Sequence, residues 1–198
     1  NAITPIQQYG YTTGKNATDS AMIIDAMDIL YSEKVDGFCL VSSDSDFTRL
    51  ATRLREAGMK VYGIGEKKTP NPFIVACDKF IYIEILKNLT EDSTLEPTTK
   101  SSNSKNNYDT ITQKEIKLIA TTIDDVADDD GWAFLGDVGS LLQKKQPNFD
   151  SRNYGFQKLT PLINSIPAFE IDSREDTRGR MKLIYVRIKE VKPKSRKR

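Results

Sequence analysis

Two aspartates follow a short apolar segment in the first half of the chain. Residues 37–42 are mostly apolar, the D-x-D motif of Asp44 and Asp46 comes directly after them, and a helical pattern begins at Phe47. A strand that ends here would place both carboxylates at its carboxyl end, where ligands bind in open α/β sheets. Helix capping explains one aspartate at such a position. Two aspartates among three serines favour a divalent-metal site, because hard cations such as Mg²⁺ bind oxygen ligands.

A second acidic group lies in the helical segment that precedes this run. Asp19 opens the predicted helix 19–32, and Asp25 follows about one and a half turns later. On a regular helix Asp25 and Asp28 share a polar stripe, whereas Asp19 lies about 120° away from Asp25. Asp19, at the N-terminal end of the helix, is therefore the better candidate for a metal ligand. A partly solvated helix face explains Asp25 and Asp28 equally well.

The composition limits the chemistry that these residues can share. The 198 residues include 29 Lys+Arg, 28 Asp+Glu, two cysteines and no histidine. Without histidine, Ser-His-Asp and Cys-His catalysis and His-containing zinc sites are excluded. The net charge of +1 argues against a uniformly basic nucleic-acid binder. Cys39 and Cys77 stand in apolar segments and form no CxxC pair, so we expect buried free thiols in a reducing compartment.

The elements that must position the aspartates alternate between strand and helix patterns. We predict strands at residues 3–9, 37–42, 60–65 and 79–84, and helices at 19–32, 47–57 and 73–77. This alternation predicts βαβ units and a parallel sheet that is covered on both faces.

The second half of the chain has a different pattern. Residues 87–109 are rich in Ser, Thr, Asn and Lys and are predicted to form a flexible linker. Helices are then predicted at 112–128, 134–144 and 153–165, followed by strands at 169–172 and 182–188 around a polar turn at 174–180. Three helices followed by a β-hairpin predict a winged helix.

A basic and aromatic surface is predicted on this second half. Tyr154 and Lys158 stand one turn apart on the third predicted helix, and Lys144, Lys145 and Arg152 lie in the preceding turn. Such groups suit phosphates and stacked bases of RNA. Scattered lysines on a solvated face are the alternative, and the neighbouring Phe149, Phe156, Leu159 and Leu162 are expected in the core. The tail, residues 189–198, holds six Lys/Arg and one Glu, and could add salt-sensitive attraction to nucleic acid.

The first half resembles the NYN domain, the LabA-like branch of the PIN-like nucleases. The resemblance rests on three stretches that cover most of residues 3–86, GKNATDSAMIIDAMDIL, GFCLVSSDSDFTRLATRLREAGMKVYGIG and TPNPFIVACDKFIYIE. It implies a Rossmann-like α/β fold and aspartates that hold Mg²⁺ or Mn²⁺ for the hydrolysis of RNA phosphodiesters. It also implies roles for five residues: Asp19, Asp44 and Asp46 as catalytic and metal-holding carboxylates, Asp25 in support of them, and Lys15 as a phosphate contact.

One departure from the family pattern concerns the start of the domain. NYN domains begin with a strand that ends in a D-x-x-N motif, whose Asp completes the acidic cluster, and the printed sequence starts beyond it. We therefore expect a domain over residues 1–86 that lacks its first strand and one metal ligand. We also expect weak nuclease activity, or none, from this polypeptide alone.

A phosphatase is a competing interpretation of the same motif. Asp44-Ser45-Asp46-Phe47-Thr48 also fits the D-x-D-x-T signature of haloacid-dehalogenase-like phosphatases, in which Asp44 would be the phosphoryl-accepting nucleophile. That fold needs a long core after the motif and a further acidic pair, which residues 128–130 could imitate. Only about 40 residues separate the motif from the predicted linker, which disfavours this interpretation.

The second half resembles the OST-HTH domain, also called LOTUS. The resemblance rests on WAFLGDVGSLL and PNFDSRNYGFQKL and extends from about residue 112 to residue 188. It implies a winged helix that binds RNA or partner proteins. The expected organisation is an NYN domain at 1–86, a linker at 87–109, an OST-HTH domain at 110–188 and a basic tail at 189–198.

Taken together, these features predict a cytoplasmic, metal-dependent ribonuclease whose OST-HTH domain brings RNA or a protein partner to it. The alternative is a non-catalytic RNA- or protein-binding module that retains the fold. No segment has the 18 or so uninterrupted apolar residues of a transmembrane helix, so no membrane association is expected.

Overall fold

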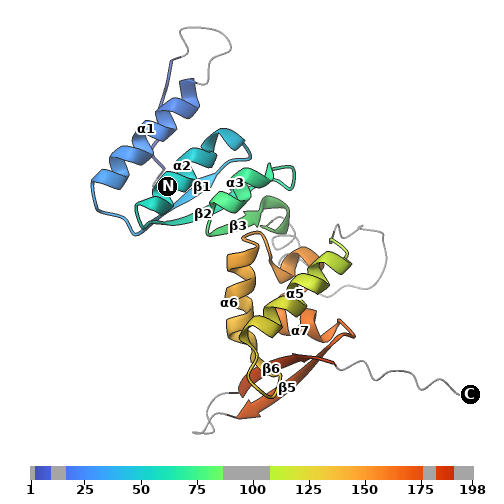
Figure 1. The fold of residues 1–198 in the computed structure, drawn as a ribbon. Coiled ribbons are helices and arrows are strands. Elements are labelled where there is room, and N and C mark those ends of the chain that lie inside the picture. Colours follow the sequence, from blue (N-terminus) through green and yellow to red (C-terminus); the bar gives the residue numbers. More distant parts are fainter. Residues whose placement is uncertain (1–2, 10–16, 87–107, 176–181, 190–198) are drawn as a thin grey trace, which may run out of the picture. The chain divides into compact units, whose positions relative to one another are not determined.

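The structure, a computed structural model, describes residues 3–9, 17–86, 108–175 and 182–189. The chain divides into two compact units, Asn1–Lys87 and Asn88–Arg198 (Figure 1). Most of the predicted linker and almost all of the predicted basic tail lie outside the described residues. Tyr108 and Asp109 are described, and the Asp109 N–H donates to the Asn153 carbonyl oxygen at 2.8 Å within the second unit.

The first unit alternates helices with parallel strands, as predicted. Its elements in chain order are α1 (Ala17–Tyr31), β1 (Gly37–Val41), the short 3-10 helix η1 (Ser45–Phe47), α2 (Thr48–Glu56), β2 (Lys60–Gly65), α3 (Asn71–Ala76) and β3 (Lys79–Tyr82). The three strands lie side by side in the order β1-β2-β3, and both pairs are parallel.

One face of this sheet carries the core of the first unit. Leu40, Val61 and Phe80 point to the same face and are at most 3% exposed, and they pack with buried residues of α1, α2 and α3. The rings of Phe73 and Phe80 meet edge to face, with 5.9 Å between their centroids. Burial of these side chains fixes the helices on the sheet, because each fully buried aliphatic or aromatic side chain contributes about 1.5–3 kcal/mol.

The opposite face of the sheet is exposed in the described part of the chain, so the prediction of a sheet covered on both faces is wrong there. Cys39 pairs with Tyr62 on this face, and Val41 lies beyond them. Val41 is 63% exposed and Tyr62 is 45% exposed. Cys39 is exposed as well, which contradicts its predicted burial, whereas Cys77 is buried as expected. The physical reason is that the core residues of the three helices all gather on the other face.

Two predicted strands differ from the structure. Residues 3–9 have no regular secondary structure, and Ile3 is 81% exposed. An apolar alternation becomes a strand only where a neighbour supplies hydrogen bonds, and the sheet of the described residues ends at β1. The last predicted strand, 79–84, ends at Tyr82, and residues 83–86 are helical.

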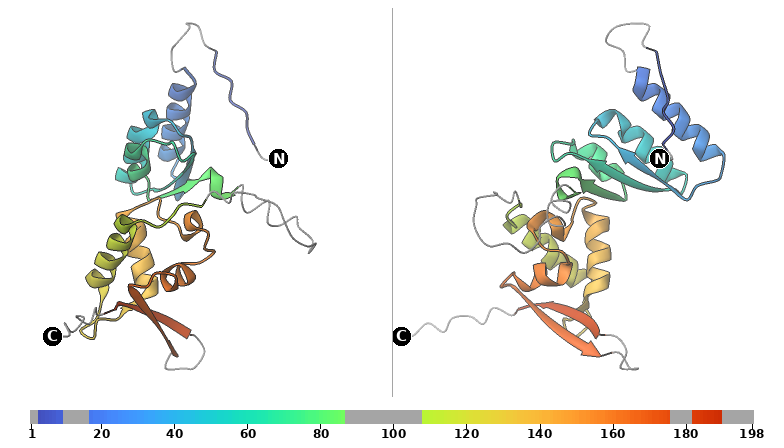
Figure 2. Two further views of the ribbon diagram at one scale, coloured as in Figure 1. Left: turned by 90° about the vertical axis from the view of Figure 1, so that its right-hand side faces the viewer. Right: turned by 180° about the vertical axis from the view of Figure 1, so that it is seen from behind.

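The second unit is a winged helix, as predicted. Its described elements are α5 (Gln113–Val126), β4 (Ala133–Phe134), α6 (Leu135–Lys145), the 3-10 helix η2 (Ser151–Tyr154), α7 (Leu159–Asn164), β5 (Phe169–Glu175) and β6 (Lys182–Ile188). The strands form an antiparallel sheet in the order β4-β6-β5, and Figure 2 shows the β5–β6 hairpin from two further sides. Ile119, Val138, Leu162 and Val186 lie in the core and are fully buried. None of the helices in the described ranges combines the length and the apolarity needed to cross a bilayer.

The third predicted helix, 153–165, is interrupted in the structure. Gly155 has φ +83°, a left-handed conformation that ends η2 and that residues other than glycine rarely adopt. Regular helix resumes only at α7, whose first residue is Leu159. Tyr154 and Lys158 are therefore not one turn apart on a common helix, which contradicts the geometry that the sequence pattern predicts. Phe149 and Leu162 are buried and Phe156 and Leu159 pack against the core, as predicted.

Candidate functional site

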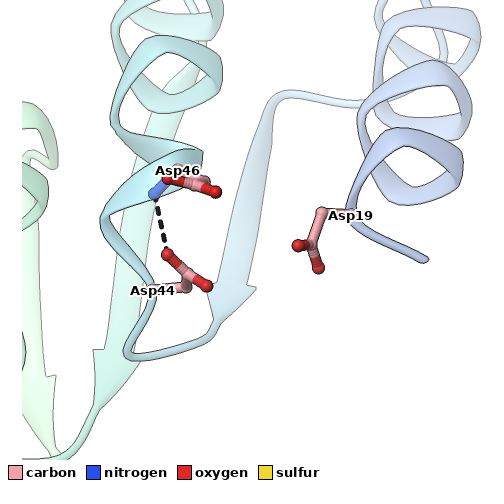
Figure 3. A group of neighbouring side chains, drawn as sticks. All are labelled: Asp19, Asp44 and Asp46. Carbon is pink, nitrogen blue, oxygen red and sulfur yellow. Dashed lines mark hydrogen bonds between the residues drawn. The ribbon is translucent and has the colours of Figure 1, made fainter. Parts of the chain in front are cut away.

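Three carboxylates from two separate segments converge in the first unit. Asp19, Asp44 and Asp46 each offer one oxygen, and these oxygens all lie within 4.8 Å of one another. Figure 3 shows Asp19 at the start of α1 facing the loop and 3-10 helix that carry Asp44 and Asp46. Asp19 is half-buried, and the other two are exposed. In the described part of the chain, no other acidic or cysteine side chains form such a group.

The backbone after β1 holds Asp44 in place through short-range hydrogen bonds. The Ser42 N–H donates to the Ile64 carbonyl oxygen of β2 at 2.9 Å, which extends the parallel pairing past the last strand residue. The Asp44 N–H then donates to Ser42 Oγ at 3.1 Å. Asp44 Oδ1 in turn accepts the Asp46 N–H at 3.0 Å and caps η1 (Figure 3). The capping that the sequence suggests is thus real, and it uses one of the two Asp44 oxygens.

A second strand end anchors the same loop. Ser43 Oγ accepts the Glu66 N–H from the residue after β2 at 2.9 Å. A Cβ atom on Gly65 would lie 2.5 Å from the Ser42 carbonyl oxygen, so this close approach requires glycine. In the sequence Ser42 and Ser43 only flank the aspartates, whereas in the structure their hydroxyls fix the loop. The run S-S-D-S-D at a strand end is the signal that could have shown it.

Asp19 reaches the cluster because α1 starts beside η1. It lies in the first turn of α1, where the N-terminal end of the helix favours a negative charge. Ala26 and Leu30, further along α1, are buried in the core and set the position of the helix. The carboxylate is therefore placed by packing along the helix as well as by its own turn.

This geometry fits a divalent cation with oxygen ligands. Mg²⁺ binds oxygens at about 2.0–2.1 Å, so two ligands on opposite sides of one ion are about 4.2 Å apart. The limit of 4.8 Å among the three carboxylate oxygens is somewhat longer than that separation, so an ion held directly by all three would draw them closer together. The donor set, carboxylates without thiolate or imidazole, suits Mg²⁺ or Mn²⁺.

Of the other two predicted residues of the first unit, Asp25 is not part of the group and Lys15 lies outside the described residues. Asp25 lies further along α1 and lines a separate cavity of about 360 Å³ with Ile6, Met22 and Phe38 among its walls.

Some of the basic residues predicted to contact RNA on the second unit already form ion pairs with nearby aspartates. Lys145 at the end of α6 forms an ion pair with Asp125 and donates to Thr122 Oγ1 at 3.1 Å. Lys144 beside it is exposed and has no ion pair in the described ranges.

Arg152 and Tyr154 are also engaged within the second unit. Arg152 donates from Nε and Nη2 to the two carboxylate oxygens of Asp150, at 2.9 and 2.6 Å. This hydrogen bond raises the pKa of Arg152 above its ordinary value, against the opposing effect of partial burial. The Tyr154 ring lies 6.1 Å from that of Phe149 and packs against the core. Lys158 is exposed just before α7.

The acidic residues that the phosphatase interpretation requires belong to a different unit from the D-x-D motif. Asp128, Asp129 and Asp130 belong to the second unit, between α5 and β4. Asp44 and Asp46 belong to the first unit and are joined there by Asp19.

Comparisons with known proteins agree with the division into two units. The chain matches the NYN domain family over residues 1–84 and the OST-HTH/LOTUS domain family over residues 108–181. One similar solved structure is the solution NMR structure of an uncharacterized protein from Nitrosomonas europaea, with 29% identity over 48% of this chain and 90% of that chain and a TM-score of 0.39. Another is residues 175–257 of a protein from Chromobacterium violaceum, with 27% identity over 39% of this chain and 82% of that chain and a TM-score of 0.33. No curated protein matches the chain. The chain thus contains an NYN domain at residues 1–84, followed by an OST-HTH/LOTUS domain at residues 108–181.

Proposed function

We propose that the NYN domain holds Mg²⁺ or Mn²⁺ on Asp19, Asp44 and Asp46 and hydrolyses RNA phosphodiester bonds. The convergence of these three carboxylate oxygens within 4.8 Å carries the proposal. NYN domains are related to the PIN-like nucleases, which typically use divalent metals. The absence of histidine from the chain is compatible with this chemistry, because it requires no imidazole base.

Each carboxylate has a separate part in this proposal. A divalent cation, when bound, activates water and neutralises the charge that develops on phosphate oxygens. Asp44 keeps Oδ1 on the Asp46 N–H and presents its second oxygen to the cation. Asp19 approaches from α1 and closes the group from the other side (Figure 3). Asp25 stays a supporting residue in the proposal, since it lies outside the converging group.

The OST-HTH domain supplies the RNA in this proposal. OST-HTH/LOTUS domains bind RNA. Lys144 and Lys158 are the better phosphate contacts of the predicted set, because Lys145 and Arg152 are already paired with carboxylates. Tethering the two domains in one chain raises the local concentration of RNA at the aspartates.

The test is cleavage of a fluorescent single-stranded RNA by the full chain. Mn²⁺ should support cleavage and EDTA should abolish it. Asp46→Asn should lower the rate by about 10²-fold, the scale on which one electrostatic contact in a transition state acts. Asp28→Asn makes the same charge change on the exposed side of α1 and should cleave at the wild-type rate.

Metal binding is measured in the same samples, because weak cleavage is the expectation from the sequence. Isothermal titration calorimetry with Mn²⁺ should show binding that Asp46→Asn removes and Asp28→Asn retains. If Asp46→Asn keeps both Mn²⁺ binding and RNA cleavage, the proposal is wrong. Absence of Mn²⁺ binding to the wild-type chain would favour the non-catalytic module. Hydrolysis of a small phosphomonoester that depends on Asp44 would favour the phosphatase.

A further inference from the structure

A cavity on the winged helix combines aromatic walls with two carboxylates. Its volume is about 350 Å³. Residues from α5, β4, α6 and β6 and from the turn after α5 line it, and we call it the acidic aromatic pocket: Val126, Asp128, Phe134, Asp137, Leu183 and Tyr185. None of the residues predicted to contact RNA belongs to this lining.

The two aromatic rings of the pocket lie next to each other and are tilted against one another. Phe134 of β4 pairs with Tyr185 of β6 in the antiparallel sheet, and their ring centroids lie 5.8 Å apart at an angle of 57°. Gly136 fits this corner, because a Cβ atom there would lie 2.5 Å from Phe134 Cε1. The pairing of β4 with β6 thus places the Phe134 ring beside Tyr185, and Gly136 leaves room for it.

The charge of the pocket is not balanced by the cations near it. Asp128 and Asp137 are both exposed and have no ion pair within the ranges that the structure describes. Arg174 on the adjacent strand binds Asp172 at 3.0 Å and approaches Asp130 at 3.9 Å. Within the described ranges, the pocket therefore presents two carboxylates that no basic side chain pairs with.

Arg187 is likewise engaged, with Glu170 at 2.8 Å on the same face of the β5–β6 hairpin. Neither Arg187 nor Arg174 lines the pocket. Among the residues that the structure describes, no Lys or Arg side chain forms an ion pair with Asp128 or Asp137, so a cationic ligand would complement their charge.

Apolar and aromatic walls beside carboxylates suit an organic cation better than a metal ion. A guanidinium group stacks on aromatic faces and donates two parallel hydrogen bonds to a carboxylate. The chain uses this chemistry on its own side chains beside the pocket. The Arg174 guanidinium carbon lies 4.4 Å from the Tyr185 ring centroid, and that of Arg187 lies 4.6 Å from the Trp132 ring centroid.

We infer that the acidic aromatic pocket binds an arginine side chain of a protein partner. The guanidinium lies against Phe134 and Tyr185 and pairs with Asp128 and Asp137. An RNA strand is the poorer occupant, because its phosphates would meet two uncompensated carboxylates. The inference does not depend on the nuclease proposal, since it concerns the second unit alone.

The probe for a test is an acetylated and amidated pentapeptide, Gly-Ser-Arg-Ser-Gly, titrated into the full chain and followed by NMR. The aromatic resonances of Phe134 and Tyr185 and the amide of Asp137 should shift. A peptide with citrulline in place of arginine has nearly the same shape without the charge. It should bind at least tenfold more weakly.

Matched variants separate the pocket from general acidity. Asp128→Asn together with Asp137→Asn should weaken arginine-peptide binding at least tenfold. The control, Asp124→Asn together with Asp129→Asn, removes the same charge from neighbouring exposed positions outside the pocket and should change binding less than twofold. Gly136→Ala, which pushes against Phe134, should weaken binding without changing the charge, and the amide spectrum of each variant shows whether it is folded.

Three results would overturn the inference. The first is an arginine peptide that leaves the Phe134 and Tyr185 resonances unshifted in the wild-type chain. The second is a citrulline peptide that binds as tightly as the arginine peptide, or a control pair that loses as much affinity as the pocket pair. The third is a single-stranded RNA that shifts the pocket resonances more strongly than the arginine peptide, which would assign the pocket to RNA.

Discussion

Replacing Asp44 by asparagine should have opposite effects on stability with and without a divalent cation. Asparagine keeps an oxygen that can accept the Asp46 N–H, and asparagine caps helices about as well as aspartate. The substitution therefore removes one negative charge while it preserves the loop. Any change in stability then reports the electrostatics of the cluster.

The magnitude follows from the distances among the carboxylates. Two unit charges 4.8 Å apart repel by about 0.9 kcal/mol in water, and salt at physiological strength reduces this to about 0.5 kcal/mol. Asp44 faces two such partners, so Asp44→Asn should stabilise the metal-free first unit by up to about 1 kcal/mol. For a domain of this size that corresponds to a rise in Tm of up to about 4–8 °C. A cation at one hundred times its Kd stabilises the wild-type chain by about 2.7 kcal/mol, and the variant should lose most of this.

Thermal unfolding in EDTA and in Mn²⁺ measures both effects on the same protein. Asp44→Asn should unfold at the same or a higher temperature than the wild type in EDTA, and at a lower temperature in Mn²⁺. Asp36→Asn is the matched control, because Asp36 is exposed at the opposite end of β1. It should follow the wild type in both buffers. If Mn²⁺ stabilises Asp44→Asn as much as the wild type, Asp44 is not a metal ligand and the reasoning fails.

Three further predictions concern single residues. Burial raises the pKa of the Cys77 thiol to about 12. At pH 8 a thiol reagent should therefore label only the exposed Cys39 in the folded chain, and both cysteines after unfolding. Labelling of both cysteines in the folded chain would contradict this prediction. Gly155→Ala should lower the free energy of unfolding, measured in urea, by about 1–2 kcal/mol, because residue 155 has a left-handed φ. Gly155→Asn should lower it by less. Equal stability of the wild type and both variants would refute this prediction. Burial opposes ionisation of Glu115, but hydrogen bonds from Thr112 lower the pKa of Glu115 below the ordinary 4.5. Thr112 and Glu115 together cap the start of α5. The stability that this cap contributes at neutral pH should therefore be lost as the pH falls below about 4.5. Thr112→Ala should remove that acid-dependent part together with about 0.5–2 kcal/mol at neutral pH, as chemical unfolding at pH 7 and pH 3.5 would show.

The position of the acidic cluster could be predicted because local rules determine it. The apolar run 37–42 forms β1 and the serine-aspartate run after it forms a capped turn, so Asp44 and Asp46 lie where the sequence places them. Asp19 could be predicted for the same reason, since it is the acidic residue at the start of a helix next to that strand. Burial of Cys77 follows likewise from its place in an apolar segment.

The errors arise where an element depends on its neighbours. The alternation of apolar and polar residues at 3–9 predicts a strand. A strand also needs a neighbouring strand to pair with, which no local pattern guarantees. Cys39 was expected inside because β1 is apolar on both faces, yet only one face meets the helices. The helix predicted at 153–165 fails at Gly155, whose freedom to adopt positive φ overrides the apolar periodicity around it.

Pairing of charges explains why basic residues alone do not mark a nucleic-acid surface. Lys145 and Arg152 look available in the sequence, but each is bound by an aspartate of the same unit. By the same reasoning, the acidic residues that point to a ligand site are those that form no ion pair with Lys or Arg. Asp128 and Asp137 in the pocket have no ion pair within the described ranges, and their charge is left for a cationic ligand. In the first unit, three carboxylates repel one another within 4.8 Å, and a divalent cation is the ligand that would turn this repulsion into attraction.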